Sequence, residues 1–82
     1  MANDKNMYFN IGLVLHGIND LQSAEEYYLK SLERHPDNAS TFYNLALTAQ
    51  QLRDDSQEVD RLLDACLEID PNFELARKMR EP

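Results

Sequence analysis

The fold is decided by residues 8–36, which read YFNIGLVLHGINDLQSAEEYYLKSLERHP, because a similar stretch follows later in the chain. Residues 42–71 read FYNLALTAQQLRDDSQEVDRLLDACLEIDP and are one residue longer. Early positions recur 34 residues later, as Tyr8 does in Phe42, whereas positions from Ala24 onward recur 35 residues later. A repeat of this length indicates stacked supersecondary units. Because loops tolerate insertions best, the extra residue predicts a loop in the middle of each unit.

Apolar residues in both copies have the spacing of a helix face. The first halves follow i, i+3, i+7 and i+10 with Tyr8, Ile11, Leu15 and Ile18, and then with Phe42, Leu45, Ala49 and Leu52. Polar capping residues precede the later helices: Asn19 or Asp20, then Asn38, then Asp55 with Glu58 as a capping box. We therefore predict helices over residues 5–18, 21–35, 39–52, 56–69 and 72–80.

The repeated positions resemble those of the tetratricopeptide repeat, whose motif is a large residue, Leu-Gly, Tyr, Ala, an aromatic residue and Pro at fixed spacing. The motif positions hold Tyr8, Ile11, Gly12, Leu15, Ala24, Tyr28 and Pro36 in the first copy, and Phe42, Leu45, Ala46, Ala49, Val59, Leu63 and Pro71 in the second. The resemblance implies an all-α, α-α superhelix of two antiparallel helix pairs plus a short C-terminal helix. The expected organisation is a single domain over residues 1–82, made of repeat 1 (5–38), repeat 2 (39–73, with the inserted residue in its inter-helix loop) and a capping helix (72–82).

The turn between paired helices departs from the family pattern. Asn19 stands where the family usually has glycine, and asparagine tolerates the left-handed conformation. In the second repeat the usual glycine is lost around Arg53 and Asp54, where the extra residue falls.

The repeat pattern ends in the last ten residues. Arg77 and Arg80 stand where a third repeat would need large apolar residues. We predict that this segment forms a terminal cap, as repeat arrays require. Its apolar side chains would pack on repeat 2 through Phe73, Ala76 and either Leu75 or Met79.

Charge excludes several classes of partner. The 82 residues include 8 Lys and Arg against 15 Asp and Glu, a formal net charge of −7. Nucleic acid and anionic membranes are therefore not expected as partners, because both require clustered cations. No stretch approaches the roughly 20 apolar residues of a membrane span. The single cysteine forms no disulfide within the chain, and we predict a cytoplasmic location.

Catalysis would have to rest on Cys66 as nucleophile with His16 or His35 as base. Cys66 stands at a packing position of the fourth helix, where repeat 1 has Ser31, so we interpret it as a core residue. One cysteine and two histidines do not complete a four-ligand zinc site. We therefore expect no enzyme, no cofactor and no metal.

The resemblance implies a concave groove, lined by the first helix of each repeat, that holds an extended peptide or a partner helix. The residues expected to line it are Asn6, Phe9, Asn10, Leu13 and His16 in repeat 1, and Ser40, Tyr43, Asn44, Leu47 and Gln50 in repeat 2. Four of these residues, Phe9, Leu13, Tyr43 and Leu47, give the first helices a second apolar face, and exposed apolar faces mark interfaces. An alternative interpretation is that Leu13 and Leu47 complete the core between the paired helices. Core packing explains Phe9 and Tyr43 less well.

The groove composition favours a protein or peptide that is apolar or mildly basic. Aromatic and aliphatic side chains would anchor it, amides of Asn10, Asn44 and Gln50 would meet its main chain, and the net negative charge would attract cations. For Asn10 and Asn44, simple solvation on the helix surface is the alternative. The carboxylate clamp of chaperone-binding members is not expected, because only Asn44 matches it. The clamp's other positions hold Phe9, Leu13, Leu75 and Met79.

The alternative function is self-association. Two repeats are fewer than the three that stacking usually needs, and the first helix has no polar cap before it. That helix, or the face carrying Phe9 and Tyr43, would then dock on a second copy and form a homo-oligomer.

Overall fold

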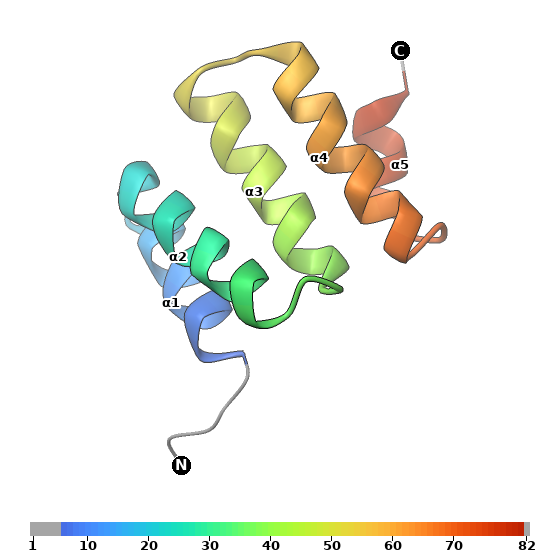
Figure 1. The fold of residues 1–82 in the computed structure, drawn as a ribbon. Coiled ribbons are helices and arrows are strands. Elements are labelled where there is room, and N and C mark those ends of the chain that lie inside the picture. Colours follow the sequence, from blue (N-terminus) through green and yellow to red (C-terminus); the bar gives the residue numbers. More distant parts are fainter. Residues whose placement is uncertain (1–5, 82) are drawn as a thin grey trace.

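The computed structural model describes residues 6–81 and forms five α-helices over that range (Figure 1). They are α1 (Met7–Gly17), α2 (Leu21–Arg34), α3 (Ala39–Leu52), α4 (Ser56–Ile69) and α5 (Glu74–Arg80). Each helix packs against the next one along the chain, and α3 lies between α2 and α4. The all-α prediction is confirmed and the helix bounds agree within two residues. The expected first helical residue, Lys5, lies outside the described residues, and α5 begins at Glu74 rather than at residue 72.

Side-chain caps explain why three helices begin where they do. The Asp20 carboxylate accepts a hydrogen bond from the backbone N–H of Ser23 at 3.4 Å, and the Asn38 amide oxygen accepts one from Thr41 at 3.3 Å. Asp55 accepts two, from Gln57 at 3.0 Å and Glu58 at 3.4 Å. These bonds satisfy donors that the first helical turn leaves unpaired.

The predicted capping box before α4 is only half formed. The Glu58 carboxylate, which a complete box would turn back to the capping residue, accepts hydrogen bonds from the Arg53 guanidinium. Arg53 also pairs with Glu25 of α2, so this arginine links the two helix pairs at the turn before α4.

Both turns inside the helix pairs contain one residue in the left-handed region. Asn19 has φ 66°, as expected, and Asp54 has φ 54°. In the second repeat, where the usual glycine is absent, Asp54 takes the left-handed conformation at this turn. Aspartate, like asparagine, can adopt this conformation because its short polar side chain can bond locally.

Close approach of α1 and α2 depends on Gly12. A Cβ atom at Gly12 would lie 2.5 Å from Cε1 and 2.6 Å from Cδ1 of Tyr28, so the glycine leaves the space that this ring occupies. Tyr28 is fully buried and forms a cluster with Ala24 and with Leu45 of α3. The core of the first pair therefore extends into the second.

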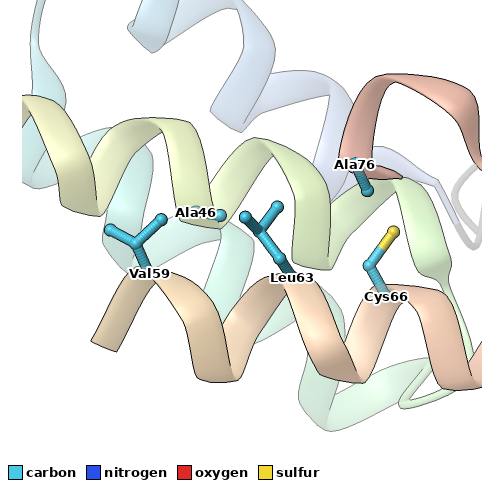
Figure 2. Close-up of a cluster of buried hydrophobic side chains, with 5 residues drawn as sticks. All are labelled: Ala46, Val59, Leu63, Cys66 and Ala76. Carbon is cyan, nitrogen blue, oxygen red and sulfur yellow. The ribbon is translucent and has the colours of Figure 1, made fainter. Parts of the chain in front are cut away.

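The second cluster joins α3, α4 and α5 (Figure 2). Its buried members are Ala46, Val59, Leu63, Cys66 and Ala76. Phe73 and Met79 pack against it as predicted, whereas Leu75 is 56% exposed and does not. Helix α5 thus covers the apolar end of repeat 2. None of the helices over residues 6–81 is long and apolar enough to cross a membrane.

Candidate interaction groove

The ten residues expected to line a groove lie on α1 and α3, with Asn6 one residue before α1. They differ in how much of each side chain remains accessible. Four are exposed, namely Asn6, Asn10, Leu13 and Gln50. The other six are half-buried, namely Phe9, His16, Ser40, Tyr43, Asn44 and Leu47. The contacts of each type of residue decide which of them could bind a partner.

His16 bridges three helices rather than facing open solvent. Its Nε2 lies 3.1 Å from Oε1 of Gln51, and its Nδ1 lies 3.4 Å from the Tyr28 hydroxyl and 3.3 Å from Oγ1 of Thr48. Thr48 donates its one hydroxyl proton to the carbonyl oxygen of Asn44 at 2.9 Å. His16 is therefore a connection between α1 and α3.

The protonation of this bridge follows from its partners. Gln51 Oε1 accepts a hydrogen bond, so the proton of neutral His16 resides on Nε2, and Nδ1 accepts from the Tyr28 hydroxyl. Burial raises the pKa of Tyr28 to about 12, which keeps the phenol protonated and able to donate. Sequence reasoning missed Thr48 and Gln51, because neither belongs to the family motif.

Phe9 and Tyr43 are more deeply packed than expected. The Phe9 ring lies 6.0 Å from the ring of Tyr28 and contributes to the first cluster. The Tyr43 ring lies 5.3 Å from the ring of Phe73 and packs on the second. The interpretation that core packing hardly explains these two side chains is therefore wrong, although both keep part of their surface exposed.

Leu13 and Leu47 are the more available apolar residues. Both lie outside the two buried clusters of the described residues, and Leu13 is 39% exposed. Asn44 turns its amide inward along its own helix, where Nδ2 donates to the carbonyl oxygen of Ser40 at 2.9 Å. Each leucine has an exposed amide three residues away on the same helix. Asn10 precedes Leu13 on α1, and Gln50 follows Leu47 on α3.

A cavity of about 440 Å³ opens where α3 and α5 begin, and we refer to it as the groove mouth. Its lining residues are Asn6, His35, Asp37, Asn38, Ala39, Ser40, Ile69, Asp70 and Phe73. Sequence reasoning found only Asn6 and Ser40. The other residues come mainly from the α2–α3 and α4–α5 turns, and the signal that could have found them is the Pro-Asp-Asn and Asp-Pro-Asn sequences at 36–38 and 70–72.

The charge of the groove mouth favours a cation. Asp37 and Asp70 contribute carboxylates, and the nine lining residues include neither lysine nor arginine. Ser40 lies three residues before Tyr43 and seven before Leu47, so one face of α3 leads from the groove mouth to the apolar residues.

The residues considered for catalysis are not assembled into a site. Cys66 is fully buried in the second cluster, where burial and the Asp70 carboxylate raise the pKa of its thiol. A thiol kept protonated is a poor nucleophile. His16 bridges α1 and α3, and His35 follows the end of α2. Within residues 6–81, no group of three or more His, Cys, Asp or Glu is placed to hold a metal ion.

Comparison with known proteins gives two matches to family models, both described as tetratricopeptide repeat. One covers residues 6–38 and the other residues 27–59. The second match begins inside α2 and ends in α4, so it spans the junction between the helix pairs.

A similar curated protein is the human (Homo sapiens) Protein O-mannosyl-transferase TMTC3. It is 33% identical over 72 residues, which make up 88% of this chain. The chain spans 8% of the length of that relative.

Proposed function

The chain belongs to the tetratricopeptide repeat family, whose repeats are protein-interaction scaffolds, and from this premise we propose that its α1–α3 groove binds an extended peptide or a partner helix. The observation that carries the proposal is the continuous α3 face from the groove mouth to Leu47. This face offers a polar, anionic end and an apolar stretch side by side.

The groove chemistry indicates which peptide fits. An aliphatic or aromatic residue of the ligand would cover Leu13 and Leu47, since these leucines are not needed in the buried clusters. A lysine or arginine of the ligand would enter the groove mouth beside Asp37 and Asp70. The net charge of −7 would speed the encounter with a basic segment.

We propose that this chain contributes binding and no chemistry of its own. Its one thiol is buried, and its histidines belong to a helix bridge and a helix end. The human relative is named as a transferase, but that name describes a protein of which this chain matches a small part. A reducing compartment such as the cytoplasm suits the free thiol.

The test is selection of binders from a random peptide library, followed by fluorescence polarisation with the best peptide. We expect selected peptides to combine a basic residue with aliphatic or aromatic residues. Leu13→Ser should weaken the chosen peptide about tenfold, because the ligand side chain loses an apolar contact. Leu29→Ser is the matched control: this leucine is 48% exposed on α2, outside the groove, and its loss should change affinity less than about twofold.

The anionic groove mouth is tested with the same peptide. Asp37→Asn combined with Asp70→Asn keeps similar hydrogen-bonding groups while removing two charges. The double variant should bind more weakly and lose most of the salt dependence that the wild type shows. Failure to select any peptide, or equal affinity for wild type and Leu13→Ser, would contradict the proposed groove.

A further inference from the structure

A second apolar surface lies on α1 and on Ile18, the residue that caps its C-terminus, and it is separate from the proposed groove. The exposed side chains are Met7 (40%), Val14 (65%) and Ile18 (69%), and the half-buried Ile11 lies between them. We call these four residues the outer stripe. Met7, Ile11 and Val14 also line an open hollow of about 350 Å³. Exposed apolar side chains that gather on one face mark an interaction surface.

The equivalent face of α3, in the second repeat, shows what packs against such a surface. Thirty-four residues after Met7, Ile11 and Val14 come Thr41, Leu45 and Thr48 of α3, which are 0%, 4% and 0% exposed. The first helix pair covers them: Leu45 packs with Ala24 and Tyr28 of α2, the Ser31 and Thr41 hydroxyls lie 3.4 Å apart, and Thr48 meets His16 of α1. In this fold, the face that α1 leaves open is therefore one against which another helix packs.

The charge of α1 allows a second copy to be that partner. Met7–Gly17 contains no Asp, Glu, Lys or Arg, although the whole chain carries a net charge of −7. Two α1 helices can therefore meet without burying an unpaired charge. An antiparallel arrangement also places the opposite ends of their helix dipoles together.

The spacing of the outer stripe is self-complementary. Steps of four, three and four residues read the same in both directions, and they match the apolar positions of a coiled coil. In an antiparallel pair, Met7 of one copy faces Ile18 of the other, and Ile11 faces Val14. A twofold axis through the middle of the stripe brings all four layers together.

At the opposite end of the described residues, α5 is mainly charged and has one exposed large apolar side chain, Leu75. Helix α5 covers the second cluster with Ala76, and its exposed side chains include Glu74, Arg77 and Lys78. Arg80 is held over α4 by Asp60 and Asp64. Copies therefore lack a matching end for head-to-tail stacking, and an association through α1 closes at two.

We propose that the outer stripe of α1 forms a symmetric, antiparallel homodimer. The contact is one short helix from each copy, so the dimer is weak and depends on concentration. Because the stripe and the groove are different surfaces, this proposal does not depend on the proposed peptide binding.

The first test is sedimentation velocity of the 82-residue chain from about 10 µM to about 1 mM. We expect wild type to shift from monomer to dimer and to form no larger species. Val14→Glu should weaken association at least about tenfold, because each copy would bury an unpaired carboxylate. Leu75→Glu is the control: it adds the same charge at a 56% exposed residue of α5 and should leave the dimer unchanged.

Far-ultraviolet circular dichroism and the melting temperature of dilute samples show whether both variants are folded, as expected from the exposure of Val14 and Leu75. A wild type that stays monomeric to about 1 mM would overturn the proposal. Equal weakening by the two variants would overturn it as well, because repulsion between whole molecules would then explain the result.

The second test examines the antiparallel register. Met7→Lys and Ile18→Glu should each weaken the homodimer, since each places a charge opposite an apolar side chain. A mixture of the two variants should recover a heterodimer, because the introduced lysine would face the introduced glutamate while the unchanged Met7 and Ile18 meet in the other layer. A parallel pair gives no such recovery, so absence of the heterodimer would overturn the antiparallel arrangement.

Discussion

Gly12 and Gly17 lie in the same helix, yet their surroundings give them different roles. Gly12 faces the buried Tyr28 ring, with aromatic carbons 2.5 and 2.6 Å from where a Cβ atom would stand. Gly17 has nothing within 4 Å of that point. Steric contact with α2 therefore requires a glycine at the first position, and nothing around the second position requires one.

These surroundings predict opposite effects of one substitution. Gly12→Ala should destabilise the fold by about 1–3 kcal/mol, because the ring of Tyr28 must move in a packed core. Gly17→Ala should stabilise by up to about 1 kcal/mol, because alanine restricts the unfolded chain. Urea denaturation of both variants measures the difference, and a destabilised Gly17→Ala together with a neutral Gly12→Ala would contradict the packing described for α1 and α2.

Tyr28 also predicts a pH dependence of stability. Burial raises its pKa from 10.0 to about 12, so the unfolded chain loses the phenol proton before the folded chain does. The stability that this group contributes is complete below about pH 10 and is lost as the pH rises toward 12. Tyr28→Phe should remove this part of the alkaline loss. Free energies of unfolding measured below pH 10 and again near pH 12 check it, and an unchanged alkaline loss in the variant would exclude Tyr28 as the source.

At the scale of the helix, short polar contacts set where each element begins. Asp55 accepts hydrogen bonds from two backbone N–H groups of α4, while Asp54 before it takes the left-handed turn. Arg53 then ties this turn to Glu25 and Glu58. Three consecutive residues therefore end α3, reverse the chain and start α4.

Removal of the α4 cap should be measurable by itself. Asp55→Ala should destabilise the fold by about 1 kcal/mol, because both hydrogen bonds to the helix start are lost. Ser56→Ala changes the neighbouring exposed residue and should cost less than about 0.5 kcal/mol. Thermal unfolding of the two variants makes the comparison, and equal losses would show that the Asp55 carboxylate does not cap α4.

For the whole molecule, the repeat and its caps predicted the helix pairs well. The turn at Asn19 could be predicted because asparagine tolerates the left-handed conformation that the turn requires. The surroundings of Phe9, Tyr43 and Leu75 could not be predicted, because helical spacing tells which residues share a face but not how far a neighbouring helix covers it. Phe73, which packs on Tyr43, follows a turn whose direction the sequence leaves open.

The candidate site also has some features that the sequence predicts and others that it does not. The α3 face could be anticipated from spacing along a single helix. The groove mouth could not, because it joins two turns that are far apart in the sequence, represented by Asp37 and Asp70. His16 was expected to face a ligand, but its contacts with Thr48 and Gln51 depend on how α1 and α3 are placed.

The central claim is that this chain binds a peptide along the α1–α3 groove. The most direct measurement is a ¹⁵N-NMR titration of the Val14→Glu variant with the selected peptide, because this substitution should weaken the proposed self-association. We predict that the largest shift changes fall on Leu13, Asp37, Ser40, Leu47 and Asp70. Changes confined to the exposed side of α2, around Leu29, or absence of any change at saturating peptide, would contradict the claim.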